Sequence, residues 1–232
     1  GESKPFLVKY GVTAEEQARL KLPCGGQLHV LLEYIDSTKV NIDVFQRLAV
    51  DLENHNRVSR IVDLNNGVIS AAAESSEDAV VIEGSRMTHS LSPMYRLLIL
   101  GAGDVAKFVA EMAIALEYDV TLCDPRPNYL DNWHVPGVET TAQLPDDVVR
   151  ERFSNPYSGI IALAHDPRVD DMALMEALKT NAFYIGAMGS IKTSAARRER
   201  LPELGLNDKE ISRLHAPIGF QINSKTPAEI AI

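Results

Sequence analysis

Residues 95–126, which read YRLLILGAGDVAKFVAEMAIALEYDVTLCDPR, hold the pattern that most restricts how this chain can fold. An apolar run leads into Gly101, Gly103 and Ala106, and apolar residues then recur at helical spacing. The first glycine permits a tight turn, the second leaves space for an anion at the helix N-terminus, and the small third residue lets helix and strand pack closely. A second apolar run ends at Asp124, about 20 residues further on. Together these features predict a strand–helix–strand unit of the Rossmann type.

The chain continues this alternation of strands and helices to its end. Residues 159–165 and 182–189 are nearly continuous apolar runs, as expected of buried parallel strands, and residues 170–178 and 194–204 have helical patterns. We therefore expect an α/β fold in which residues 95–232 form a Rossmann-like parallel sheet flanked by helices. The first helix of this domain is expected to bury one apolar face, made of Val105, Phe108, Val109, Met112, Ala113 and Leu116.

The first third of the chain has a different pattern, which predicts a smaller α+β domain over residues 1–86. Residues 27–35 are a strand candidate, and residues 41–56 predict a helix that Asn41 caps. Residues 87–94 lie in a stretch rich in Ser, Gly and Pro, and we expect a linker there. The predicted helix has an apolar face made of Val44, Phe45, Leu48 and Leu52. Three short apolar runs are expected to form a meander of strands: 60–64, 67–73 and 79–84.

Charge and cysteine content exclude some classes of protein. The formal net charge of −9 argues against a general nucleic-acid binder, because Lys and Arg supply most of that affinity. Two cysteines, Cys24 and Cys123, are too few for a disulfide framework and indicate a reducing, cytoplasmic location. No apolar run approaches the roughly 18 residues that span a bilayer, so we expect no membrane association. The chain starts without methionine, and we expect that one or both natural ends lie outside this sequence.

Several polar residues at predicted strand ends are candidates for cofactor binding. Asp124 would favour a free ribose 2′-hydroxyl, whereas Arg126 would suit a 2′-phosphate; Asp124 would equally well cap a turn before Pro125. His165 follows a predicted strand, and Asp166 and Asp170 would orient it for proton transfer in an NAD(P)-dependent oxidoreductase. The alternative is an ordinary strand-to-helix turn in which the aspartate caps the next helix.

A second glycine turn, YIGAMGS, would expose backbone N–H groups of Gly186, Gly189 and Ser190 to an anion. Nearby positive charge would come from the next helix, on Lys192, Arg197 and Arg198. The alternative is a tight turn followed by a solvated basic helix face.

The two cysteines have different surroundings. Cys24 stands beside Gly25 and Gly26, in a flexible stretch where its sulfur would stay accessible to a soft metal or to sulfur chemistry. Cys123 lies inside an apolar run, which is typical of a structural cysteine.

Taken in order, five stretches resemble the landmarks of the XdhC/CoxI family, and they cover nearly the whole chain from about residue 5. They are LPCGGQLHVLLEY, LLILGAGDVAKFVAEMAIALEYDVTLCDPRPNYL, AHDPRVDD, FYIGAMGSIKTSAARRERL and RLHAPIGFQINSKTPAEIAI. The last of these stretches are more specific than the glycine turn. Two positions depart from the family pattern: Asp104 stands where His is frequent, and Asn223 where glycine is usual.

The resemblance implies an accessory factor more than an enzyme. Family members bind the molybdenum cofactor, protect it and help to deliver its sulfurated form to apo-hydroxylases of the xanthine dehydrogenase type. The implied partners are the apo-hydroxylase and a cofactor sulfurase, and a homo-oligomer would be compatible. The family's Cys-Gly-Gly motif falls on Cys24, Gly25 and Gly26, and our hypothesis is that Cys24 would face the molybdenum. Gly101 and Gly103 would then hold the phosphate of molybdopterin or of its nucleotide form. The alternative function remains an NAD(P)-dependent oxidoreductase.

Overall fold

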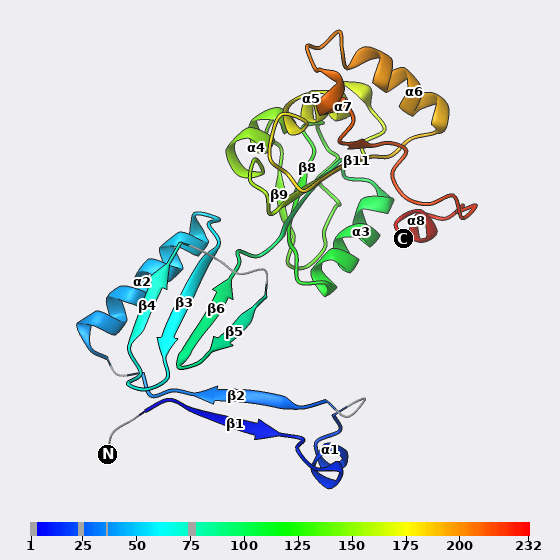
Figure 1. Ribbon diagram of the computed structural model, residues 1–232. Helices are drawn as coiled ribbons and strands as arrows, with labels where there is room; N and C mark the ends of the chain where they lie inside the picture. The colour runs from blue at the N-terminus through cyan, green and yellow to red at the C-terminus, as the bar shows by residue number, and fades with distance from the viewer. Residues whose placement is uncertain (1–3, 23–25, 36, 74–77) are drawn as a thin grey trace. The chain divides into compact units, whose positions relative to one another are not determined.

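The computed structural model describes residues 4–22, 26–35, 37–73 and 78–232. The chain divides into two compact units, Gly1–Pro93 and Met94–Ile232, which are described separately (Figure 1).

The second unit is built on a six-stranded sheet in which each strand is parallel to its neighbours. Its strands lie in the order β12-β11-β10-β7-β8-β9, so the chain starts in the middle of the sheet and winds outward in both directions. This is the strand order of a Rossmann fold, and it confirms the predicted fold class. The strands are β7 (Arg96–Leu100), β8 (Asp119–Cys123), β9 (Glu139–Thr141), β10 (Ser158–Ala162), β11 (Tyr184–Ala187) and β12 (Leu214–His215).

Helices flank this sheet and define two separate cores. Helix α3 packs against β7 and β8 in one core, while α5 packs against β10, β11 and α4 in the other. Near the chain end, α8 packs against α3. The helices are α3 (Asp104–Ala115), α4 (Pro145–Arg152), α5 (Pro167–Ala177), α6 (Ile191–Arg200), α7 (Asp208–Ile211) and α8 (Pro227–Ile230).

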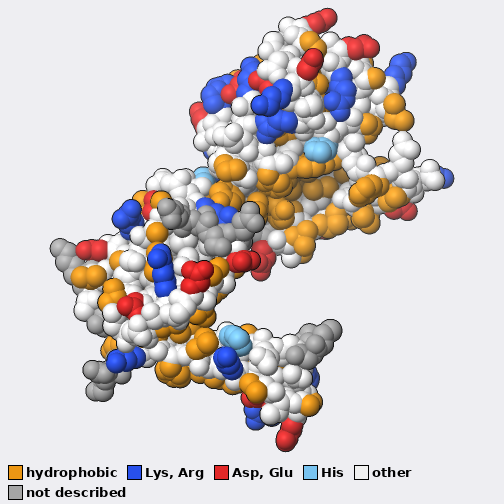
Figure 2. Space-filling view, viewed as in Figure 1, with side chains coloured by type: hydrophobic (Ala, Val, Ile, Leu, Met, Phe, Trp, Pro, Cys, Tyr) orange, Lys and Arg blue, Asp and Glu red, His pale blue; other side chains and the backbone are white. Residues whose placement is uncertain are grey.

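Helix α3 buries only part of its predicted apolar face: Ala113 is buried, and Val105 and Val109 are half-buried against the core. The fully buried or nearly buried positions are Ala106, Ala110 and Ala113, whereas Phe108 is 39% exposed and Leu116 71% exposed. The reason is steric, because a helix that follows a glycine turn lies close to its strands and only small side chains fit between them. Figure 2 shows hydrophobic side chains gathered on the surface of this unit.

The first unit contains two antiparallel sheets. A four-stranded sheet has the order β4-β3-β6-β5, and α2 packs against β3 and β4. Its core is formed by Val62, Ile69 and Met87, against which residues of α2 and Leu31 of β2 pack. The elements are β1 (Phe6–Tyr10), α1 (Ala14–Arg19), β2 (Leu28–Leu32), α2 (Lys39–Glu53), β3 (Val58–Asp63), β4 (Ile69–Ala72), β5 (Val80–Glu83) and β6 (Arg86–Leu91).

Three details of the first unit correct the sequence predictions. Most of the expected linker, 87–94, belongs to β6, whose Met87 and Ser90 are buried, because short polar residues also pair well in a sheet. The strands do not form a simple meander, since β6 pairs with both β3 and β5. Helix α2 is capped at Thr38 and not at Asn41, while its predicted apolar face is confirmed, with Leu48 only 3% exposed.

Candidate functional site

The glycine turn after β7 is shaped by a close backbone contact. Gly101 has a φ of 101°, and a Cβ atom there would stand only 2.4 Å from the Cα atom of Ala164, in the loop that follows β10. Gly103 caps α3 with a φ of −96°, and no atom lies within 4 Å of the position of its missing Cβ. The first glycine is therefore required by packing, and the second leaves open space at the start of α3.

Asp124 is fully buried and is engaged by neighbouring N–H groups. It accepts hydrogen bonds from the Ala102 backbone N–H at 2.8 Å and from Arg126, whose Nη2 lies 2.6 Å from Oδ2. Burial acts to raise the pKa of Asp124, but the Arg126 and Ala102 hydrogen bonds outweigh it and hold that pKa below its ordinary value. Arg126 also donates to the Ala164 carbonyl at 3.2 Å. Asp124 and Arg126, both proposed as ribose ligands, thus tie the glycine turn to the β10 loop.

His165 and its neighbouring acids do not form the expected relay. Asp166 caps α5 by accepting from the Arg168 N–H, and it pairs with the Arg168 side chain at 3.0 Å. Asp170 accepts from the Ala164 N–H and from Arg197. In the described part of the chain, neither carboxylate has a hydrogen bond to the exposed His165 imidazole, so the capping alternative describes Asp166.

The turn after β11 contains two glycines with different roles. Gly186 is buried, and a Cβ there would stand 2.5 Å from Ile218 Cδ1 and 2.9 Å from the Tyr184 ring, so this glycine serves packing. Gly189 leads into Ser190, whose hydroxyl caps α6 by accepting from the Thr193 N–H at 3.1 Å. Only the second part of the turn faces open space.

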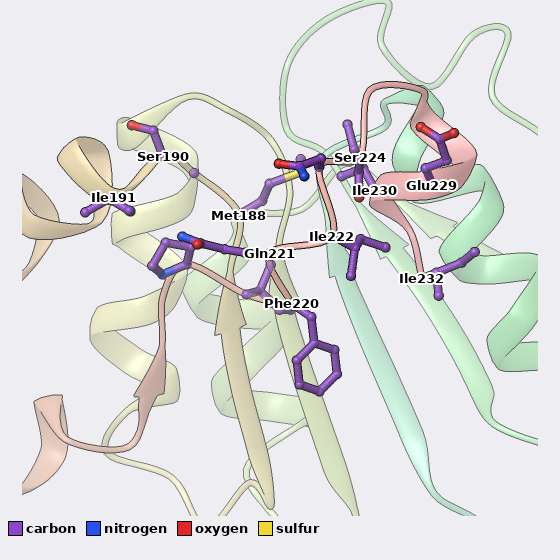
Figure 3. A pocket seen from close by; sticks show the side chains of 15 residues that line it. Met188, Ser190, Ile191, Phe220, Gln221, Ile222, Ser224, Glu229, Ile230 and Ile232 are labelled. Atoms are coloured by element: carbon purple, nitrogen blue, oxygen red, sulfur yellow. The ribbon is translucent and has the colours of Figure 1, made fainter.

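Two adjoining cavities lie at this turn, at the carboxyl ends of β10 and β11. The smaller, of about 360 Å³, is lined by polar side chains that include His165, Asp170 and Thr193. The larger, of about 620 Å³, is bounded on one side by Met188 and Ser190 and on the other by the apolar side chains of residues 217–232 (Figure 3). Both cavities are lined by Met188, Gly189, Ser190 and Ile230. Because ligands of α/β sheets bind at the carboxyl ends of strands, this is the candidate binding site.

The contribution of residues 217–232 was not predicted as part of a site. Phe220 is 90% exposed and Ile232 80% exposed, so large apolar side chains are held at the cavity rim. The sequence feature that could have identified this segment is the number of large apolar residues in a short stretch that is otherwise polar. Asn223 has a φ of 58°, a backbone conformation that glycine and asparagine adopt most readily. Asn223, which stands where the family usually has glycine, is therefore compatible with the same local backbone conformation.

The expected basic face of α6 is largely absent. Arg197 is 2% exposed and pairs with Asp171 at 2.8 Å and with Asp170 at 3.1 Å, while Arg198 donates to backbone carbonyls. Burial raises the pKa of Asp170 to about 6, although Arg197 and the Ala164 N–H act to lower it. Lys192 alone, of the three basic residues, is exposed at the start of the helix.

The cysteine motif can be placed only in part. Cys24 and Gly25 lie outside the described residues, and Gly26 is exposed. Cys123 is buried, its thiol donates to the Gln143 carbonyl, and burial with the adjacent Asp124 raises its pKa to about 12, which confirms a structural role. Within the described ranges, no cluster of His, Cys, Asp and Glu is arranged to hold a metal ion. Nor does any helix there have the length and apolar character of a membrane span.

A parallel sheet in this strand order, with a glycine turn and a cavity at its carboxyl edge, defines an α/β domain of the Rossmann class. The sequence profile of the XdhC Rossmann domain matches residues 97–232, which is more than half of the chain. The chain therefore belongs to the XdhC family.

Individual relatives extend this result beyond the Rossmann domain. The chain is 26% identical over 220 residues to the molybdenum cofactor insertion chaperone PaoD of Escherichia coli, an alignment that covers 95% of this chain and 61% of PaoD. It is 27% identical to a probable subunit of xanthine dehydrogenase from Bacillus subtilis, over 61% of this chain and 41% of that protein. The chain thus spans less than two thirds of either relative.

A solved structure agrees with the fold. The crystal structure of a protein from Bacillus halodurans, described as a xanthine dehydrogenase, superimposes with a TM-score of 0.69 at 24% identity. The superposition covers 99% of this chain and 73% of that one, and at this identity it shows the fold alone.

Proposed function

We propose that this chain binds the molybdenum cofactor, protects it and delivers it to the apo-enzyme of a molybdenum hydroxylase of the xanthine dehydrogenase type. The observation that carries the proposal is the alignment with the cofactor insertion chaperone PaoD, because it runs through both structural units and covers 95% of this chain. Membership of the XdhC family supports the same function.

The candidate site has the chemistry that such a ligand requires. The cofactor is a flat pterin with an anionic phosphate and a dithiolene-bound metal. The larger cavity offers an apolar wall to the ring, through Ile218, Ile222 and Ile230, and the start of α6 offers N–H and hydroxyl donors. The residues present therefore fit the pterin and phosphate parts of the cofactor.

The other predicted contacts are part of the proposal. Gly101 contacts Ala164, and the next residue, His165, lines the smaller cavity, so a ligand extending along the sheet edge would reach the glycine turn. We propose Cys24 as the residue that faces the molybdenum. A cofactor sulfurase would be a second partner, since the metal must carry its sulfur before delivery.

The geometry does not favour the alternative of an NAD(P)-dependent oxidoreductase. The Asp124 carboxylate, needed for a ribose hydroxyl, already accepts from Ala102 and Arg126, and among the described residues neither Asp166 nor Asp170 is hydrogen-bonded to His165 to orient it for proton transfer. A delivery factor needs neither group, because it binds its ligand without transforming it.

A retention experiment tests the proposal. The purified chain is incubated anaerobically with molybdenum cofactor released from a donor enzyme, and bound molybdenum and pterin are measured after gel filtration, with NAD(H) and NADP(H) in parallel. We expect near-stoichiometric pterin and activation of an apo-hydroxylase. Nicotinamide binding with turnover, and no pterin, would overturn the proposal.

A pair of cysteine variants sharpens this test. Cys24→Ser is expected to lower molybdenum retention and target activation, whereas Cys123→Ala, at a buried thiol, is expected to leave both unchanged. Equal retention by both variants would contradict the role of Cys24 and leave the delivery function standing.

A further inference from the structure

The start of α6 carries more hydroxyl groups than helix capping requires. Ser190 Oγ and Thr193 Oγ1 lie 2.9 Å apart, and Ser190 already caps the helix. Ser194 is 2% exposed, and its Oγ atom has no hydrogen-bond partner among the described residues. An unpaired buried hydroxyl destabilises a protein by about 1–3 kcal/mol. Its presence here therefore calls for a reason beyond folding.

The unpaired hydroxyl lies against the turn that forms the cavity wall. Ser194 Oγ is 3.7 Å from the position that a Cβ on Gly189 would occupy. Gly189, Ser190 and Thr193 line the smaller cavity, and Ser194 stands four residues after Ser190, on the same side of the helix. Because residue 189 is glycine, it places no side chain of its own between the Ser194 hydroxyl and the turn, and the Thr193 side chain packs beside that hydroxyl.

The electrostatics of this helix start favour an anion. The first turn of α6 has no acidic residue and includes the exposed Lys192, and the Asp170 carboxylate that lines the smaller cavity is paired with Arg197. The nearby guanidinium of Arg197 is paired with Asp170 and Asp171. The remaining donors are hydroxyls, backbone N–H groups and one ammonium, which suit a tetrahedral oxyanion better than a planar carboxylate bound by an arginine fork.

We infer that Ser190, Thr193 and Ser194, with Lys192, form the subsite for the terminal phosphate of the bound ligand. This inference rests on the proposed function, since the molybdenum cofactor supplies both the phosphate and the flat ring that contacts the apolar wall. The glycine turn after β7 is then not the phosphate site, because its Ala102 N–H is bound to Asp124 and Asp104 adds an exposed negative charge.

Two substitutions test the subsite, and the second replaces the Ser190 side-chain cap by glycine, which is also favoured at the N-cap position. Ser194→Ala deletes a hydroxyl that has no structural partner, and Ser190→Gly deletes the second hydroxyl while keeping a residue that caps well. Ser59→Ala is the matched control, because Ser59 in β3 is also fully buried and also has an unpartnered hydroxyl. The probe is inorganic phosphate, titrated while the backbone amide shifts of residues 191–194 are followed by NMR.

We expect saturable shifts in the wild type, about tenfold weaker phosphate binding in Ser194→Ala and Ser190→Gly, and no change in Ser59→Ala. Unchanged affinity in both α6 variants, or no saturable shift in the wild type, overturns the subsite even if the chain retains the cofactor. If the wild type retains no molybdenum cofactor while the α6 variants still lose phosphate, the proposed function fails and the subsite stands for another phosphate-bearing ligand.

Discussion

The two glycine turns of the Rossmann unit have the same local architecture, but different groups surround them. Each joins a buried parallel strand to a helix, after β7 in one case and after β11 in the other. At the first, the Ala102 N–H donates to buried Asp124, and Gly101 is pressed against Ala164. At the second, the helix begins with hydroxyls and without acids, next to both cavities. The comparison teaches that a glycine motif identifies a fold, whereas anion binding requires that the N–H groups of the turn are not already bonded within the protein.

The largest effect is expected at the second turn, from Arg197→Met. The substitution leaves Asp170 without its buried partner and Asp171 with Arg200 alone, which should lower the free energy of unfolding by about 4 kcal/mol. Arg168→Met is the control, because its pair with Asp166 is exposed and screened by solvent and should contribute little to stability. Urea unfolding measures both. A similar small loss in the two variants would show that the Arg197 cluster does not support this turn.

Gly101→Ala tests the close contact at the first turn. The new Cβ would overlap the Ala164 backbone at a φ of 101°, and we expect a loss of about 3 kcal/mol in unfolding free energy. Gly103→Ala meets no atom within 4 Å and has an ordinary φ, so its cost should stay below about 1 kcal/mol. Equal urea midpoints for the two variants would show that the close contact between Gly101 and Ala164 does not restrict this turn.

Asp124→Ala asks whether the acid is what keeps the first turn from binding anions. It frees the Ala102 N–H and the Arg126 guanidinium, and should cost about 2 kcal/mol of stability while adding a phosphate site. The gain is measured as new phosphate-dependent amide shifts at residues 102–105. If a folded variant lacks these shifts, a feature other than Asp124 prevents phosphate binding at this turn.

The pH dependence of Asp170 tests the environment of the second turn. Burial raises the pKa of this carboxyl from 3.8 to about 6, so the folded state binds its proton more tightly than the unfolded state. The stability of the wild type relative to Asp170→Asn should therefore fall as the pH rises from about 4 to about 6 and be constant above that range. A relative stability that rises over the same interval would mean that the Arg197 pair dominates over burial.

Asn223→Gly should have the smallest effect. At a φ of 58°, glycine relieves a modest backbone strain but adds flexibility to the unfolded chain, so a change within about 0.5 kcal/mol is expected. Asn223→Val, at the same position, should cost about 1–2 kcal/mol. Thermal unfolding of the two variants measures this, and equal melting temperatures would show that residues 217–232 adopt another conformation.

The sequence predicted the fold well because periodicity reports burial in long elements. Continuous apolar runs gave β10 and β11, and the pattern around Gly101 gave β7, α3 and β8. The pattern failed in two places: α3 buries its alanines and not Phe108, and β6 is a strand although Ser, Gly and Pro suggested a linker.

The site was less predictable, since partners far apart in the chain determine what each residue does. Nothing local to Asp124 shows that Ala102 and Arg126 occupy it, and nothing local to Arg197 shows that α5 supplies two carboxylates. Gly189 and Ser190 were predicted from the sequence as a possible anion-binding turn, but the Ser194 hydroxyl and the wall formed by residues 217–232 emerge only from the fold.

A structure of the chain with bound molybdenum cofactor is the most direct test of this account. The account predicts the cofactor in the cavities at Gly189, with its phosphate within hydrogen-bonding distance of Ser190 and Thr193. A phosphate bound at the start of α3, beside Gly103, would contradict it.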